Sequence, residues 1–279
     1  MIERARPLLG TIASVRAAAL TQPFAIDAAF AAIAEVQTVM SAFEAGSDLT
    51  RLHASPVGKP VSLHPLTAEV VSFGLELAKF SDGLFDLAMG GEAAARGSLP
   101  QPIHARHALD DVQGASWRDI EFSDGDIVLK RPLWLDLSGI AKGFAVDQAL
   151  RTLKDAGVTQ ATVNIGGDLA VFGPCSEIVQ LRTTAPGVAP DIEISDAAVA
   201  SSGGAVGWVA TRHFHGPRRD TIDPNRFAAV IAPDCMTADA LTKVVLSAEE
   251  IDKGLLAHYG ARAVRHADDG WRIFGDDHG

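Results

Sequence analysis

The segment PLWLDLSGIAKGFAVDQAL, residues 132–150, begins as an apolar, strand-like run and continues as an amphipathic helix after Gly143. Between the two lie Asp136, Ser138 and Lys142, separated by apolar residues and glycines. A strand–turn–helix of this kind suits an oxyanion, because a helix N-terminus offers free amides and a partial positive charge. Lys142 would add a point charge on a phosphate. The pattern equally fits a tight turn with a solvated lysine, and its spacing matches neither a Walker loop nor GxGxxG.

A second glycine-rich segment, NIGGDL, spans residues 164–169. Its order of Gly166, Gly167 and Asp168 would bring a carboxylate and bare backbone amides to a ligand. The same residues would also make a plain turn between two short strands. In HFH, residues 213–215, two imidazoles would share one face of a strand, but a third clustered ligand for zinc is missing.

The segment TADALTK, residues 237–243, is predicted to begin a helix at a threonine cap, with Asp239 in its first turn. A carboxylate there commonly complements the helix dipole. It would also hold a divalent cation, with Thr242 close to the same face. Lys243 follows Asp239 by four residues, the spacing of an ordinary ion pair within a helix. The residues alone leave both interpretations open.

Composition excludes several classes of protein. A chain of 279 residues, 47% hydrophobic and 21% charged, has the composition of a soluble globular protein with a sizeable core. The net charge of −11 argues against a nucleic-acid partner, which needs a basic face. The two cysteines, Cys175 and Cys235, form no CxxC pair, so a disulfide framework is not expected.

The N-terminal residues contain no apolar signal core and no lipidation cysteine. No window of the sequence approaches the length expected of a membrane span. We therefore expect a cytoplasmic protein that lacks a membrane span.

Apolar periodicity predicts helices over residues 26–42 and 66–80, the second with Thr67 as a plausible cap. The helix that follows Gly143 is expected to end near Ala156. Residues 90–116 are rich in Gly, Ala, Pro and His without a firm period, so irregular structure is expected there.

Two aspartate–glycine pairs, Asp124-Gly125 and Asp269-Gly270, predict β-hairpins. Further strand candidates are residues 11–17, the two runs in QATVNIGGDLAVFG, and the segments EIVQLRT, AAVASSG and FAAVIAP. Helices and hairpins occur without regular βαβ alternation, so the predicted fold class is α+β. No linker divides the chain, and a single domain over residues 1–279 is expected.

Taken together and in order, several segments resemble the ApbE family, the FAD:protein FMN transferases, from about Pro7 to about Leu256. The matching segments are PLLGTIASV, MSAFEAGSDLTRL, SDGLFDLAMG, DLSGIAKGFAVD, VNIGGDL, AVASSG, TIDP and TADALT. DLSGIAKGFAVD resembles the most specific of the family's motifs. The resemblance implies an ApbE-like α+β fold, with mixed or antiparallel sheets and packed helices.

The resemblance also implies a function. The enzyme would be a Mg²⁺-dependent transferase that moves the FMN moiety of FAD to a Ser or Thr hydroxyl of a partner flavoprotein and releases AMP. Such a reaction needs charge neutralisation on a diphosphate, which one Mg²⁺ ion and oriented amides can provide. The Ala141 carbonyl and the Asp239 side chain would ligate Mg²⁺, with Thr242 as a further candidate. Lys142, Asp168 and Asp239 would form the catalytic set.

FAD, the donor substrate, would contact residues throughout the matched segments. Leu9 and Phe43 match positions that pack on the flavin. The positions implied to bind FAD are Leu9, Phe43, Leu84, Phe85, Asp86, Ser138, Phe144, Gly166, Gly167, Ser202, Ile222 and Asp223.

The sequence departs from the family pattern at three places. Asp220 stands where histidine is usual, Arg226 and Phe227 replace a Thr-Gly pair, and Lys243 stands where a threonine usually helps to bind the metal. The ammonium of Lys243 would occupy the place of the cation, pair with the neighbouring aspartate, or point away while a threonine ligates. Two alternatives to a transferase follow: an FAD pyrophosphate hydrolase, and a non-catalytic FAD-binding relative with a degenerate metal site.

Overall fold

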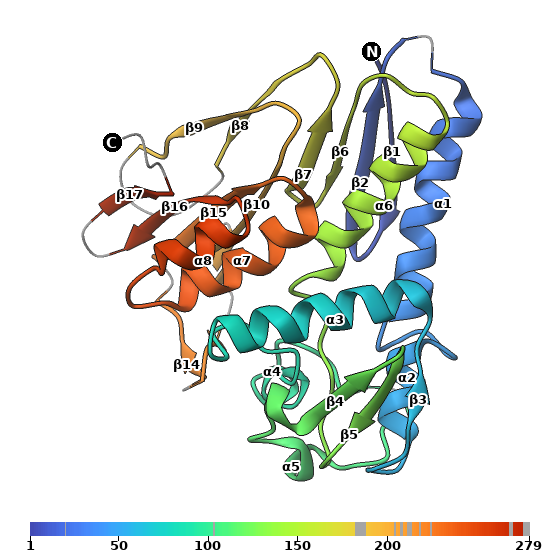
Figure 1. Ribbon diagram of the computed structural model, residues 1–279, viewed down its shortest axis with the longest axis vertical. Helices are drawn as coiled ribbons and strands as arrows, with labels where there is room; N and C mark the ends of the chain where they lie inside the picture. The colour runs from blue at the N-terminus through green and yellow to red at the C-terminus, as the bar shows by residue number, and fades with distance from the viewer. Residues whose placement is uncertain are drawn as a thin grey trace. The chain divides into compact units, whose positions relative to one another are not determined.

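The computed structural model describes residues 1–19, 21–102, 104–181, 188–203, 205–206, 209–210, 214–217, 219–223, 225–267 and 270–275 (Figure 1). For residues 205–206, 209–210, 214–215 and 220–221 it describes the backbone. The chain divides into two compact units. Unit 1 comprises Met1–Ala34, Lys142–His215 and Arg219–Gly279, and unit 2 comprises Glu35–Ala141 and Gly216–Arg218. The single domain expected from the sequence stays a prediction.

Unit 1 is built on an eight-stranded sheet in which every neighbouring pair of strands is antiparallel. In spatial order its strands are β1 (Ile2–Leu8), β2 (Thr11–Ala17), β6 (Ala161–Ile165), β7 (Asp168–Phe172), β10 (Ala198–Gly203), β15 (Phe227–Ala232), β16 (Arg262–Ala267) and β17 (Gly270–Phe274). Three short strand pairs accompany the sheet: β8 (Glu177–Gln180) with β9 (Asp191–Ile194), β11 (Ala205–Val206) with β12 (Val209–Ala210), and β13 (Phe214–His215) with β14 (Asp220–Thr221).

The helices of unit 1 are α6 (Ala141–Asp155), α7 (Cys235–Ser247), α8 (Lys253–His258) and the first part of α1 (Pro23–Met40). Helix α7 packs on β10 and β15 and also contacts β7 (Figure 1). Side chains alternate between the faces of a strand, so Val171 and Val199 join an apolar cluster on one face. Asp168 in β7 and Ser202 in β10 have the opposite parity. The period of two therefore directs both polar side chains away from that cluster.

Glycines shape the surroundings of the site in two ways, at a turn and at a contact between helices. Gly166 begins the two-residue turn between β6 and β7, where Ile165 pairs with Asp168. Gly166 and Gly167 have φ of 63° and 104°, a left-handed conformation that glycine adopts without strain. A Cβ on Gly143 would lie 2.2 Å from the Cys235 carbonyl oxygen, so only glycine lets α6 approach α7 this closely.

Unit 2 contains four helices, one 3₁₀ turn and a small sheet among its described residues, besides the end of α1. They are α2 (Asp48–Ala54), α3 (Pro65–Phe80), α4 (Gly90–Ala95), α5 (Leu109–Val112), η1 (Trp117–Asp119), β3 (Val61–Ser62), β4 (Ile120–Ser123) and β5 (Asp126–Leu129). The strand order is β3-β5-β4, all antiparallel. The Asp124-Gly125 turn, with φ of 52° and 83°, joins β4 to β5 as the sequence predicts.

The secondary structure confirms the α+β class, the helices near 26–42, 66–80 and 143–156, and strands at 11–17, in the two runs around NIGGDL, and in EIVQLRT, AAVASSG and FAAVIAP. Residues 90–116 are less irregular than expected, since they contain α4 and α5. Strand β16 pairs with β17 as a hairpin, with Ala267 opposite Gly270. Asp269 of the predicted turn and His213 of the HFH segment lie outside the described residues.

The strand predicted at the start of the opening segment is wrong. Residues 133–137 are mostly buried, but they belong to no helix or strand. Their backbone groups are satisfied one at a time: the Leu135 amide donates to His53 Nε2 at 2.9 Å, and the Asp136 amide donates to the Leu87 carbonyl at 2.8 Å. Burial lowers the pKa of His53 to about 4, so its ring is neutral at pH 7 and can accept.

Both predicted threonine caps are also wrong. His64 caps α3, and its Nδ1 accepts from the Leu66 amide at 3.3 Å, whereas Thr67 lies inside the helix. Asp234 caps α7 and accepts from the Thr237 amide at 2.8 Å. The cap lies three residues earlier than predicted, so Asp239 is in the second turn of α7.

Helix α1 is long and apolar enough to cross a membrane by length and composition alone, and 39% of its 18-residue window is buried. The expectation that no window reaches this length is therefore wrong. Ile26, Phe30, Ile33 and Val36 are almost fully buried at helical spacing, which is typical of a helix packed on a core. The cytoplasmic location stays a prediction.

Candidate functional site

Four charged side chains meet inside unit 1. Lys142 comes from the first turn of α6, Asp168 from the first residue of β7, and Asp239 and Lys243 from one face of α7. Asp239 is fully buried, and the side chains of Asp168 and Lys243 are 3% and 9% exposed. Charges are costly to bury unless they are paired, so the four groups stabilise one another as a set. We call them the charge cluster.

Asp239 is the centre of the charge cluster. Its Oδ1 accepts from Lys243 Nζ, and its Oδ2 accepts from the Gly143 amide at 3.1 Å and lies 3.5 Å from Lys142 Nζ. Burial alone would raise the pKa of Asp239, but the ammonium groups of Lys142 and Lys243 outweigh burial and hold it below its usual value. Asp239 is therefore a carboxylate at neutral pH.

Lys142 connects the two carboxylates. Its Nζ donates to Asp168 Oδ2, in addition to the approach to Asp239. Burial disfavours its ammonium, but the charges of Asp239 and Asp168 raise the pKa of Lys142 above its usual value. Burial, and then the charge of Asp239, raise the pKa of Asp168 to about 6. With its side chain 32% exposed, Lys142 is the cluster member that solvent reaches most easily.

Lys243 is held by oxygen atoms of its own helix. Besides Asp239 Oδ1, its Nζ donates to the Asp239 carbonyl at 3.1 Å and to Thr242 Oγ1 at 3.0 Å. Thr242 Oγ1 donates to the Asp239 carbonyl at 2.7 Å, and Ser202 Oγ lies 2.8 Å from Thr242 Oγ1. A hydroxyl has one proton, so Ser202 is the donor in that pair.

Asp147 was not identified from the sequence as a functional residue. Its two carboxylate oxygens accept from the Cys235 and Met236 amides at 2.9 and 2.8 Å, at the beginning of α7. Burial raises the pKa of Asp147 to about 7. These bonds tie α6 to α7 and so support the contact between Gly143 and Asp239. The signal was present, because Asp147 is the last residue of the segment DLSGIAKGFAVD.

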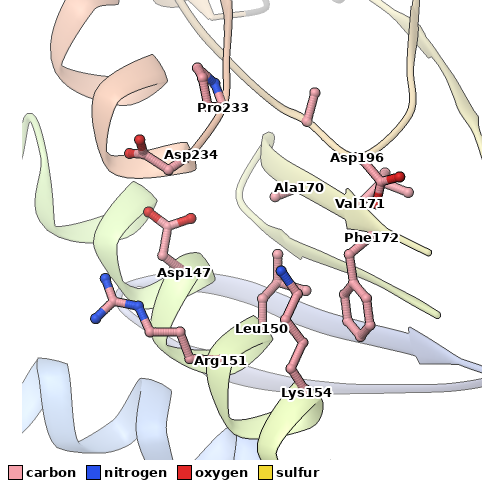
Figure 2. A pocket seen from close by; sticks show the side chains of 11 residues that line it. Asp147, Leu150, Arg151, Lys154, Ala170, Val171, Phe172, Asp196, Pro233 and Asp234 are labelled. Atoms are coloured by element: carbon pink, nitrogen blue, oxygen red, sulfur yellow. The ribbon is translucent and has the colours of Figure 1, made fainter. Parts of the chain in front are cut away.

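A cavity lies on the same side of α6 as Asp147, between α6, β7 and the beginning of α7 (Figure 2). Its lining residues are Asp147, Leu150, Arg151, Lys154, Ala170, Val171, Phe172, Asp196, Ala197, Pro233 and Asp234. None of the residues implied to bind FAD or metal lines this cavity. It is therefore distinct from the predicted site.

The predicted FAD-binding residues fall in both units. Those in unit 1 are Leu9, Phe144, Gly166, Gly167, Ser202, Ile222 and Asp223, and those in unit 2 are Phe43, Leu84, Phe85, Asp86 and Ser138. Ala141, the first residue of α6, also belongs to unit 2. Within unit 1 the structure brings Lys142, Asp168, Asp239, Thr242 and Ser202 together. The binding roles of all these residues stay predictions.

Several of these positions have surroundings that the sequence did not reveal. Phe144 is fully buried, and Phe85 and Ile222 are 4% and 7% exposed. The glycine amides expected to be bare are bonded: Gly166 donates to the Ile12 carbonyl at 3.3 Å, and Gly167 donates to Asn164 Oδ1 at 2.9 Å.

The other positions are closer to solvent. Leu9 and Leu84 are half-buried, Ser138 and Asp223 are exposed, and Phe43 is 42% exposed. The Asp86 carboxylate accepts from the Ala88 amide at 2.8 Å. A large aromatic side chain exposed to this degree, as in Phe43, is available to a flat apolar ligand.

Comparisons with known proteins give the family. The model of the ApbE family matches residues 9–263. The FAD:protein FMN transferase of Vibrio cholerae serotype O1 is 27% identical over 243 residues, which are 77% of this chain and 71% of that protein. The corresponding protein of Chlamydia pneumoniae is 25% identical over 265 residues, covering 87% and 81% of the two chains.

Solved structures give the same fold. The flavin transferase ApbE from Vibrio cholerae superposes with a TM-score of 0.81 at 22% identity, covering 98% of this chain and 96% of that one. The apo form of the Pseudomonas stutzeri flavinyl transferase ApbE gives a TM-score of 0.80 at 21% identity, covering 98% and 93%. With the family model matching nearly the whole chain, this protein belongs to the ApbE family.

Proposed function

We propose that this protein is an FAD:protein FMN transferase. A Ser or Thr hydroxyl oxygen of an acceptor flavoprotein attacks the phosphorus on the FMN side of FAD. The bond from that phosphorus to the bridging oxygen breaks, and AMP leaves with the bridging oxygen. The names of the curated relatives support this function, as does the family match over residues 9–263.

The charge cluster carries the proposal on the structural side. Lys142 combines partial exposure with a raised pKa, so it presents a permanent positive charge at the first turn of α6. That charge would neutralise the developing charge on the diphosphate of FAD. Asp168, whose pKa of about 6 is close to neutral pH, is suited to accept the proton of the acceptor hydroxyl.

The resemblance also implies Mg²⁺ at Ala141, Asp239 and Thr242, but the side chains present do not fit it. The oxygens of Asp239 and Thr242 already accept hydrogen bonds from Lys243. Among the residues whose placement is described, no group of three or more His, Cys, Asp or Glu could hold a metal ion. No step of the proposed reaction is therefore routed through a metal.

A second candidate, an FAD-binding relative without catalysis, is favoured by one observation. The ammonium of Lys243 takes up the oxygens that the resemblance assigns to the metal. If transfer depended on a divalent cation at those atoms, this chain would bind FAD and leave it intact.

The test is to incubate the purified chain with FAD and a pool of synthetic peptides that each contain one Ser or Thr. The matched control pool carries Ala at those positions. A transferase gives peptides heavier by the FMN moiety, together with an equal amount of AMP, from the first pool alone. Equal AMP from both pools without labelled peptide would identify a hydrolase. Bound FAD without AMP would identify the non-catalytic relative.

A further inference from the structure

We propose that the ammonium of Lys243 is the resident cation of this site, in the place that the resemblance assigns to a divalent metal ion. As far as it concerns catalysis, this inference rests on the proposed function, which would then proceed without a bound divalent cation. The part that concerns metal binding stands on the geometry of Asp239, Thr242 and Ser202 alone.

The atoms around Lys243 Nζ are those that surround a bound cation. An ammonium group has three donors. The three acceptors of Lys243 Nζ are a carboxylate oxygen of Asp239, the carbonyl oxygen of Asp239 and, at 3.0 Å, the hydroxyl oxygen of Thr242. Carboxylate, carbonyl and hydroxyl oxygens are the ligands of a hard cation such as Mg²⁺. The surroundings are those of a cation site, and the cation is covalently attached to the protein.

Thr242 Oγ1 has no lone pair left for a metal ion. A hydroxyl oxygen has one proton and two lone pairs. Thr242 Oγ1 gives its proton to the Asp239 carbonyl at 2.7 Å and accepts from Lys243 Nζ and from Ser202 Oγ. A metal ion could bind this oxygen only after one of these hydrogen bonds had broken.

The charges of the site are already balanced without a metal ion. The charge cluster contains the ammonium groups of Lys142 and Lys243 and the carboxylates of Asp168 and Asp239, so its formal charge is zero with all four ionised. Adding a dication to a buried neutral cluster would leave two positive charges uncompensated. Removing Lys243 would leave one negative charge, together with oxygens that have lost their donor. The same backbone would then favour a divalent cation.

The test is a titration with Mn²⁺ alone, in which electron paramagnetic resonance reports the free ion. The variants are Lys243→Thr, which supplies a second hydroxyl, and Lys253→Thr, the same change at an exposed lysine of α8 in unit 1. We expect Lys243→Thr to bind one equivalent of Mn²⁺ at least about tenfold more tightly than the wild type or Lys253→Thr. Adding Asp239→Asn to Lys243→Thr should abolish that binding.

The wild type decides the proposal even if Lys243→Thr does not fold, which circular dichroism would reveal. The proposal would be overturned if the wild type bound one equivalent of Mn²⁺ with a micromolar dissociation constant and Asp239→Asn abolished that binding. The titration is run with and without FAD, against FAD alone as a blank. Because the arm without FAD needs no flavin chemistry, failure of the proposed function would not alter its result.

Discussion

Gly143 on α6 and Asp239 on α7 are joined by a hydrogen bond from the Gly143 amide to Asp239 Oδ2, at 3.1 Å. A Cβ at Gly143 would lie 2.8 Å from Asp239 Cβ and 2.2 Å from the Cys235 carbonyl oxygen. Neither atom can move without moving α7. The close approach of the two helices therefore positions the charge cluster.

Gly143→Ala should destabilise the protein by about 1–3 kcal/mol, the usual cost of inserting a methyl group into a well-packed core. Urea unfolding would measure this loss. The matched control is Gly74→Ala in α3, where the new Cβ would meet the end of the Leu87 side chain rather than backbone. Gly74→Ala should lower the free energy of unfolding by clearly less than Gly143→Ala does. Equal losses of stability in the two variants would show that α6 and α7 can separate freely.

Lys142→Met should lower the rate of AMP formation by about 100-fold, because a preorganised charge aimed at the phosphate is lost. Lys142→Arg keeps the charge and should retain more activity than Lys142→Met. Chromatography of AMP measures the rate, and flavin fluorescence measures FAD affinity separately. An unchanged rate in Lys142→Met would remove Lys142 from the catalytic set.

His53 should make unit 2 sensitive to mild acid. The pKa of His53 is about 4 in the folded protein, against an ordinary value of 6.5 that applies to the unfolded chain. The unfolded chain therefore binds a proton first as the pH falls. Stability should be lost as the pH falls from about 6.5 towards 4, by about 3 kcal/mol at about 1.4 kcal/mol for each pKa unit. His53→Gln should flatten the pH profile of the urea midpoint over this window. A wild-type profile parallel to that of the variant would contradict the account.

Asp147 should give the free energy of unfolding a pH dependence opposite to that from His53. Burial raises its pKa from 3.8 to about 7, so the folded state binds the proton more tightly than the unfolded chain. The contribution of Asp147 is fully present below about pH 4 and is lost as the pH rises through about 7. The stability of the wild type relative to Asp147→Asn should therefore fall across this range. A difference that grows with pH would show that the carboxylate, rather than the acid, is the better acceptor for the Cys235 and Met236 amides.

Local signals account for what the sequence predicted well. The Asp124-Gly125 and Gly166-Gly167 turns follow from residues that adopt positive φ at low cost. The pairing of Asp239 with Lys243 follows from a spacing of four residues, which places the two side chains on one face of a helix.

Long-range contacts account for what the sequence missed. Residues 133–137 have strand composition, but their partners, including His53, are distant in sequence and form no ladder. Likewise, Ser202 and Thr242 are 40 residues apart, and only the fold places their hydroxyls 2.8 Å apart. Asp234, rather than Thr237, caps α7, three residues earlier than predicted.

AMP formation from FAD and the Ser/Thr peptide pool, measured in EDTA and in MgCl₂, tests most directly whether this chain cleaves FAD with its own charges. If the ammonium of Lys243 replaces a divalent cation, the rates of AMP release and of peptide flavinylation should be the same under both conditions. AMP and labelled peptide that appear in MgCl₂ and vanish in EDTA would show that a divalent ion, rather than the ammonium of Lys243, is the cation of the site.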